Sequence, residues 1–189
     1  MNKKVRVGLM LDSYSVPHWV YRMIERIQRD GHAEIALVIS NQSDSQPARG
    51  FWDKIKGNHG QLFYLALLKI EGALYRPSWD PFAETDLRPL LSDTPELPVQ
   101  PVQKRYSDYF TRADVEQIRS CELDVLVRLG FRILRGEILR CARLGVWSYH
   151  HGDNDHNRGG PAGFWEVLQG WQETGAILQV LTEDLDGGQ

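Results

Sequence analysis

Two continuous apolar runs separated by an amphipathic helix pattern begin this chain, and they limit the folds open to it. The runs are VRVGLML at residues 5–11 and EIALVIS at residues 34–40, and both are typical of buried strands. Between them, residues 17–27 carry apolar side chains at helical spacing. A helix here supplies the right-handed crossover that two parallel neighbouring strands require. The sequence therefore predicts a β-α-β unit at the start of an α/β domain.

The same alternation continues along the chain. Further strands are predicted at residues 124–129, 146–150 and 176–183, with a short or edge strand at residues 97–102, where each of two prolines removes a hydrogen-bond donor. Thr111 and Asp114 match the pattern of a helix N-terminus, and residues 136–143 are expected to form another helix after an apolar turn at residues 131–134. We therefore expect one Rossmann-like, three-layer α/β domain with a mostly parallel sheet, spanning residues 1–189.

A less regular region at about residues 45–93 has the character of an insertion. Within it, residues 61–75 predict an apolar helix, and Phe63, Leu67, Ile70 and Leu74 share one of its faces. We expect a packed helix or a lid, and a face that docks on a membrane surface or in a partner groove is the alternative. The longest apolar run, residues 62–68, is far shorter than the ~20 residues that a spanning helix needs.

Composition bounds the class of protein. A chain of 189 residues with 42% hydrophobic and 25% charged residues is long enough for one core. Its net charge of -3 provides no basic field for nucleic acid, so a small-molecule partner is expected. Cys121 and Cys141 lack metal-ligand spacing, and Arg6 and Asp12 interrupt the first apolar run, so no signal peptide is predicted. These features favour a reducing, cytoplasmic location.

The chemistry-bearing side chains gather in residues 146–188. A strand there ends on His150 and His151, and a later strand ends on an acidic turn that contains Asp186. Ligands of parallel α/β sheets bind beyond the carboxyl ends of strands, so we expect His150 and Asp186 to meet. Such a histidine can be a general acid or base, a metal ligand or a hydrogen-bonded structural residue.

A metal site is disfavoured by the spacing. The run HHGDNDH at residues 150–156 lacks the regular ligand intervals of a preformed cage. A calcium loop is also a poor match, because Arg158 occupies the glycine position and Phe164 the position of the bidentate glutamate. No metal is therefore predicted.

The last third of the chain resembles the formyltransferase family. The matching segments are DVLVRLGFRIL, Leu144-Gly145, Ser148-Tyr149-His150, Arg158-Gly159, Gly170 to Gly175 and Leu185-Asp186-Gly187-Gly188. The resemblance implies the formyltransferase fold and transfer of a formyl group from the co-substrate 10-formyltetrahydrofolate to a small-molecule amine, here of an amino sugar or sugar nucleotide. The chain stops directly after the acidic turn with no helix predicted to cover the last strand, so we expect a C-terminal strand and helix to be missing. A further domain beyond Gln189 is an option that goes with this expectation.

The resemblance assigns roles to particular residues. Ser148, His150 and Asp186 take the catalytic positions. The folate is expected between an apolar loop and the acidic turn, formed by Leu129, Gly130, Phe131, Ile133, Leu134, Thr182, Glu183 and Asp184. The acceptor is expected at His151, Asp153, Asn154 and Arg158.

Two departures from the family pattern bear on activity. Ser148 replaces the family's catalytic asparagine, and residues 152–155 (GDND) replace its S-L-L-P loop. A serine hydroxyl is a shorter donor to an oxyanion, and Asn154 or His151 are candidates to substitute. Either transfer uses a remodelled oxyanion site, or the domain is a catalytically inactive ligand-binding part of a larger sugar-transfer protein.

Overall fold

A computed structural model describes residues 3–43, 62–74, 78–151 and 163–184. Its centre is a six-stranded sheet with the order β11-β10-β8-β1-β3-β5. The strands are β1 (Val5–Leu11), β3 (Ala33–Asn41), β5 (Glu96–Val99), β8 (Val125–Arg128), β10 (Val146–His151) and β11 (Ala176–Val180). All neighbours pair in parallel except β10 and β11. The predicted α/β class with a mostly parallel sheet is therefore confirmed.

The predicted β-α-β unit is present at the start of the chain. Helix α1 (His18–Asp30) connects β1 to β3, which lie side by side with Val5 opposite Ala33. The helix ends at Gly31, whose φ of 72° is the left-handed conformation that glycine adopts at little cost. Strand β5 forms one edge of the sheet, as its prolines predicted.

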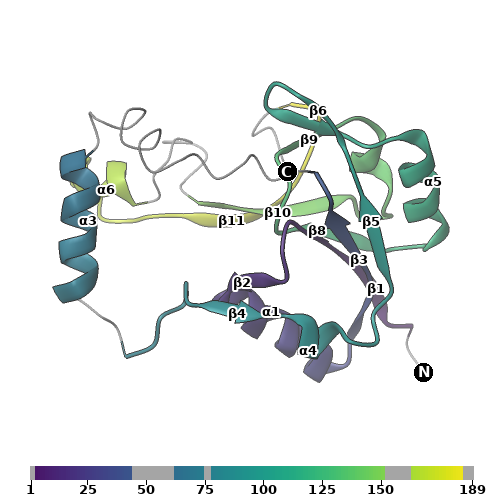
Figure 1. Ribbon diagram of the computed structural model, residues 1–189, viewed down its shortest axis with the longest axis horizontal. Helices are drawn as coiled ribbons and strands as arrows, with labels where there is room; N and C mark the ends of the chain where they lie inside the picture. Colours follow the sequence, from purple (N-terminus) through teal and green to yellow (C-terminus); the bar gives the residue numbers. More distant parts are fainter. Residues whose placement is uncertain (1–2, 44–61, 75–77, 152–162, 185–189) are drawn as a thin grey trace.

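Helices lie on both faces of the central sheet and give the domain three layers (Figure 1). An apolar cluster fills the space on each face. On one face, Val20 and Ile24 of α1 pack with Leu9 and Leu11 of β1. On the other, Val115 and Ile118 of α5 (Arg112–Ser120) pack with Met10. The predicted helix start is confirmed, because the Thr111 side chain accepts from the Asp114 backbone N–H and the Asp114 side chain accepts from that of Thr111.

The segment after β8 differs from the prediction. Residues 133–135 form strand β9 (Ile133–Arg135), and the expected helix at residues 136–143 is only the short 3₁₀-helix η2 (Gly136–Arg140). Strand β9 pairs with β7 (Ser107–Tyr109), which also pairs with β6 (Val102–Lys104), in a separate three-stranded sheet. The backbone pairing with β7 overrode the local apolar pattern.

The last strand runs opposite to its neighbour. Trp147 pairs with Val180 and His150 with Ile177, so β10 and β11 are antiparallel. The carboxyl end of β11 consequently lies beside the start of β10, where the Leu181 backbone N–H donates to Val146 O over 2.7 Å. The carboxyl ends of β10 and β11 therefore lie at opposite edges of the sheet, so the rule for parallel strands from which a meeting of His150 and Asp186 was predicted does not apply to this pair.

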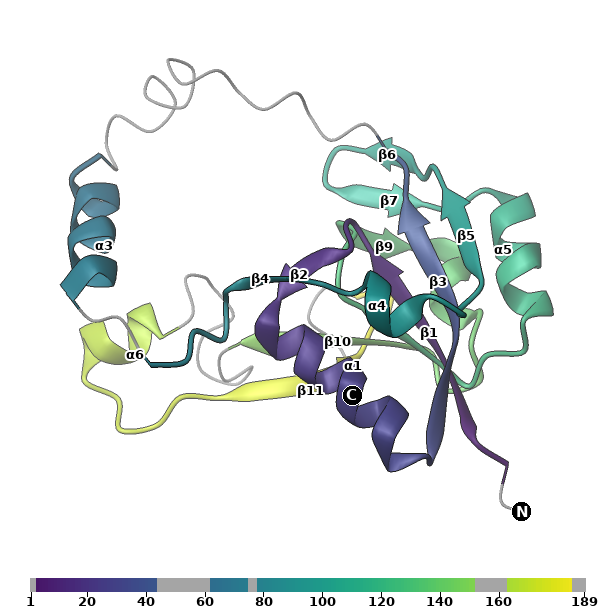
Figure 2. The same cartoon turned by 60° about the horizontal axis from the view of Figure 1, so that its bottom comes forward.

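Two described elements of the inserted region pack against the body of the domain, and a third, a helix, lies apart from it. Strand β4 (Glu84–Asp86) pairs with β2 (Ser15–Pro17), and the short α4 (Arg88–Leu91) packs Leu91 in the core beside α1. Helix α3 (Leu62–Leu74) lies at the end of the molecule that also holds α6 (Phe164–Gln169), away from the main sheet (Figures 1 and 2).

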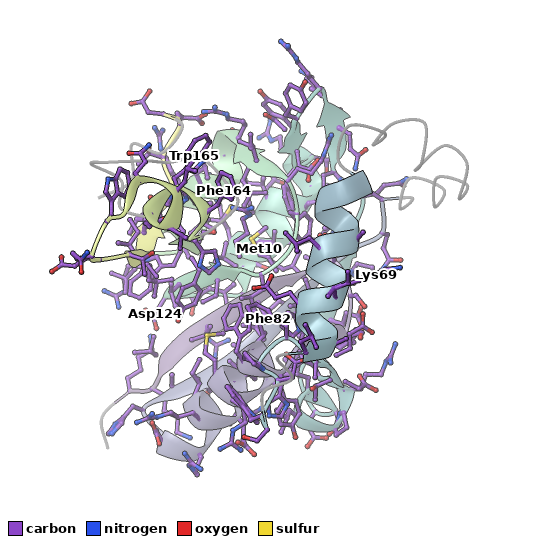
Figure 3. The ribbon with its side chains drawn as sticks, turned by 90° about the vertical axis from the view of Figure 1, so that its left-hand side faces the viewer. Met10, Lys69, Phe82, Asp124, Phe164 and Trp165 are labelled. Atoms are coloured by element: carbon purple, nitrogen blue, oxygen red, sulfur yellow. The ribbon has the colours of Figure 1, made fainter. Side chains whose placement is uncertain are left out.

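Helix α3 is present as predicted, but its described side chains are not packed. Leu67, Ile70 and Leu74 are all more than half exposed, so the expected burial of this face is not observed. Figure 3 shows Lys69 on α3 and, separately, Phe164 and Trp165 on α6. In the described part of the chain, no helix combines the length and apolarity needed to cross a membrane.

Candidate functional site

Strand β10 presents its histidines on opposite faces, because successive side chains of a strand alternate. Ser148 and His150 line a cavity of about 290 Å³. His151 lines another cavity, of about 340 Å³, to which Tyr149 also contributes. His151 therefore does not line the first cavity with His150, although Ser148 lines both cavities. The prediction that His151 substitutes for the missing asparagine stays a prediction.

The first cavity has one apolar wall and one polar wall. Ile133 and Leu134 of β9 form the apolar side, and Thr182 and Asp184 after β11 contribute polar groups. Glu183 links the acidic turn to the start of η2. Its carboxylate accepts a hydrogen bond from the Gly136 backbone N–H over 3.0 Å and lies 3.8 Å from the Arg135 guanidinium. The acidic turn is thus held against the start of η2.

The imidazole of His150 has an open hydrogen-bonding position. Its Nε2 atom is buried and has no hydrogen-bond partner among the described residues. An unpaired buried nitrogen is costly, so a partner from a ligand or another segment would stabilise it. Asp186, the partner predicted from the sequence, lies outside the described residues, and the pairing stays a prediction.

Ser148 is buried and bonded to a cation. Its hydroxyl oxygen accepts from Arg128 Nη1 over 3.1 Å, and the residue is 4% exposed. The Arg128 guanidinium also donates from Nε to Gly130 O over 3.2 Å. Burial lowers the pKa of Arg128 below its usual range, while the charges of Asp12 and Asp108 oppose that shift.

The predicted folate loop is divided between the two cavities. Ile133 and Leu134 line the first, whereas Leu129, Gly130 and Phe131 line the second. Asp12, Trp19 and Val20 complete much of the second cavity. The Trp19 and Tyr149 rings meet edge to face there, with centroids 5.3 Å apart.

Two carboxylates fix this loop. Asp12 Oδ1 accepts from the Phe131 backbone N–H over 2.9 Å, and the buried Asp108 accepts from the backbone and side chain of Arg132. Phe131 has a φ of 65°, a strained conformation for a residue with a side chain. Gly130 is required at its position, because a Cβ there would collide with the Asp12 backbone.

Asp12 and Arg128 are site residues that the sequence prediction missed. The sequence contains a feature that could have identified each of them. Asp12 follows the first buried strand directly, and Arg128 is the one charged residue inside the apolar strand pattern VLVRL. Three predicted acceptor-site residues, Asp153, Asn154 and Arg158, lie outside the described residues.

Comparison with solved structures identifies the fold. A glycinamide ribonucleotide transformylase from Symbiobacterium toebii matches with a TM-score of 0.56 and 15% identity, over 97% of this chain and 68% of that one. A phosphoribosylglycinamide formyltransferase from Anaplasma phagocytophilum matches with 0.54 and 14%, over 98% and 68%. A formyltetrahydrofolate deformylase from Pseudomonas syringae pv. tomato matches with 0.53 and 21%, over 97% and 48%.

The search of protein-family models and that of curated sequences each returned no match. The similarity thus lies in three-dimensional structure, and the chain has the fold that these formyltransferases and this deformylase share. The predicted formyltransferase fold is confirmed.

Proposed function

We propose that this chain transfers a formyl group from 10-formyltetrahydrofolate to an amine. The observation that carries the proposal is the placement of Ser148 and His150 together in a cavity of the fold that solved formyltransferases share. A hydroxyl donor and an imidazole with an open nitrogen are suited to an acyl-transfer site, where charge develops on a carbonyl oxygen.

The first cavity is the proposed folate site. A pterin ring has flat apolar faces and hydrogen-bonding edges, so it needs a pocket with both kinds of wall. Ile133 and Leu134 can cover a ring face, and Thr182 and Asp184 can meet its polar edge. The hydrogen bond from the Gly136 backbone N–H to Glu183 holds these two sides of the cavity together before any ligand binds.

The reaction requires stabilisation of one negative charge and movement of one proton. Attack of the amine forms a carbon–nitrogen bond and moves the carbonyl π electrons onto oxygen. Protonated His150 and the Ser148 hydroxyl would face that oxyanion, and Asp186 is proposed to stabilise the imidazolium. Collapse breaks the bond to the folate nitrogen, which takes a proton as the amine loses one. The products are an N-formylated amine and tetrahydrofolate.

An amino sugar or sugar nucleotide is the proposed acceptor. The second cavity supports this class, because Trp19 and Tyr149 offer aromatic surface next to the polar groups of Asp12 and His151. Pockets that combine aromatic faces with a few placed polar groups suit ligands with apolar ring faces and polar edges. Asp153, Asn154 and Arg158 are proposed to add further contacts to the acceptor.

The proposal is tested with purified full-length chain. It is mixed with 10-formyltetrahydrofolate and a set of amino sugars, and tetrahydrofolate is followed by absorbance while mass spectrometry detects the N-formyl product. We expect a product that gains one formyl group and disappears in His150→Asn. Release of formate without an amine product would instead indicate hydrolysis.

A catalytically inactive ligand-binding domain is the alternative, and binding distinguishes it from no folate site at all. Calorimetric titration with a non-hydrolysable formyl-folate analogue should give binding that weakens when Leu134 is changed to Asp. Binding without turnover would support the inactive domain. Absence of both binding and turnover would refute the folate proposal.

A further inference from the structure

Arg128 is a partly buried cation at the junction of the two cavities. It is the last residue of β8, and its side chain lines both the cavity of Ser148 and His150 and the cavity of Trp19 and His151. Its two hydrogen-bond acceptors, Ser148 Oγ and Gly130 O, are both neutral. Among the described residues, the positive charge therefore lies next to the proposed reaction centre without a carboxylate in contact.

The nearby carboxylates are bonded elsewhere. Asp12 Oδ1 accepts from Asn41 and from the Phe131 backbone, and Asp108 pairs with Arg132 at 2.8 Å. Within residues 3–43, 62–74, 78–151 and 163–184, no carboxylate forms an ion pair with Arg128. Arginine stays charged in proteins, so it cannot avoid the cost of burial by losing its proton.

A purely architectural role would be redundant. The loop after β8 is already tied to β1 by the bond between Asp12 and the Phe131 backbone, and to β7 by the Arg132–Asp108 pair. A partly buried charge is an expensive way to add one further bond to Gly130. Positions that retain such a cost are commonly functional.

The bond to Ser148 determines how its hydroxyl can be used. A guanidinium has no acceptor, so the Ser148 proton cannot point back to Arg128. Among the described residues, the hydroxyl's other bond is to Tyr149 O, at a long 3.4 Å. The proton is consequently available to an oxygen placed in the cavity, and the adjacent positive charge makes the hydroxyl a stronger donor.

We propose that Arg128 is a positioning residue that orients and polarises Ser148 as the oxyanion donor of this site. The inference rests on the proposed formyl transfer and explains how a serine can stand where related enzymes are expected to use an asparagine. When the amine attacks, the carbonyl electron pair moves to oxygen and Ser148 donates its hydroxyl hydrogen bond there. The charge of Arg128 then stabilises the same oxyanion through Ser148.

The test is a double-mutant cycle in kcat and KM with Arg128→Met, Ser148→Ala and the pair. We expect Arg128→Met to lower kcat by ~10-fold or more and to change KM little. The upper limit of the effect is the ~10²–10³-fold fall in kcat that follows loss of a full oxyanion donor. In the Ser148→Ala background, Arg128→Met should lower kcat by a much smaller factor, because Arg128 would have no hydroxyl to polarise. Additive effects would overturn the proposal.

Two controls separate this role from folding and from charge. Arg112→Met removes an exposed arginine of α5 that is remote from the cavity and should leave kcat unchanged. Arg128→Lys keeps the charge and one donor, so it should recover part of the activity. If Arg128→Met does not fold, the cycle is run with Arg128→Gln, which keeps a hydrogen-bond donor and removes the charge, and an Arg128→Gln protein as active as the parent overturns the proposal.

A binding measurement keeps this inference distinct from the formyl-transfer proposal. Formate, titrated into the full-length chain and followed by NMR, probes the oxyanion position directly. We expect shifts around Ser148 and His150 in the parent and no binding in Arg128→Met. If formate binds this way but no amine is formylated, the formyl-transfer proposal is wrong and the role of Arg128 in an anion site is supported. If Arg128→Met binds formate as the parent does, the inference fails even where transfer occurs.

Discussion

Asp12 accepts a hydrogen bond of 2.9 Å from the backbone N–H of Phe131, a residue 119 positions later in the chain. The bond joins the loop after β1 to the loop after β8 at the carboxyl edge of the sheet. It also holds Phe131 at its positive φ, which a side chain adopts only when its surroundings enforce it. The site loop is therefore strained at Phe131, and this bond is one of the contacts that hold it in place.

Removing that tie should loosen the loop. Asp12→Ala leaves the Phe131 N–H and the Asn41 side-chain amide without their shared acceptor. We expect the free energy of unfolding to fall by about 1–2 kcal/mol, because one hydrogen bond usually contributes about 1 kcal/mol net. Asp12→Asn is the matched control, because an amide oxygen can still accept. Urea unfolding of the three proteins gives the comparison, and equal losses in both variants would show that charge and not the bond is what matters.

His150→Asn should abolish turnover while leaving the fold intact. The imidazole faces a cavity and its Nε2 atom has no partner among the described residues, so its loss removes little packing. We expect kcat to fall by ~10²–10⁴, the range for loss of a general acid or base. Asp186→Asn should also be severe, since an amide cannot stabilise an imidazolium. Circular dichroism provides the check on folding, and an unfolded His150→Asn protein would make the histidine structural.

Ser148→Asn introduces the residue that the formyltransferase resemblance leads one to expect. Ser148 is buried and its Oγ lies 3.1 Å from Arg128, so the larger amide would displace the guanidinium. We expect kcat to fall by ~10-fold or more, because the oxyanion would lose part of its hydrogen-bond donation. The measurement is steady-state kinetics at saturating amine. A rise in kcat would show that serine is simply a weakened donor and that Arg128 does not compensate for it.

Asp124 should make stability depend on pH. The Arg6 backbone N–H, at 2.9 Å, and then the Arg143 side chain, at 2.8 Å, hold the pKa of this carboxyl below its usual range. A lowered pKa contributes stability that is complete above the ordinary value of about 4 and is lost as pH falls through the folded value. The Tm of Asp124→Asn should therefore lie below that of the parent at neutral pH.

The gap between the two melting temperatures should close in acid. Thermal melts of both proteins between about pH 3 and pH 7 record it. A gap that stays constant across this range would mean that the asparagine variant is destabilised by packing, with no contribution from the carboxylate charge.

The periodicity of apolar residues was enough to predict the elements that the core dictates. Buried strands and amphipathic helices have different repeat lengths, so β1, α1 and β3 could be identified from the sequence, and their parallel order followed from the crossover rule. The start of α5 at Thr111 was equally local, because its capping box depends on two side chains three residues apart. The formyltransferase fold was predicted from the resemblance of residues 123–188 to that family.

Tertiary contacts decided the direction of β11, the secondary structure of residues 133–140 and the division of the site into two cavities. Side-chain alternation is the same in parallel and antiparallel strands, so no periodicity could show that Trp147 pairs with Val180. Strand β9 forms because β7 offers it backbone partners, which residues 133–135 cannot supply for themselves. In the sequence, Arg128 is distinguished only as the charged residue of an apolar strand pattern. The packing of β8 against β10 leaves its charge partly buried between two cavities and bonded to Ser148.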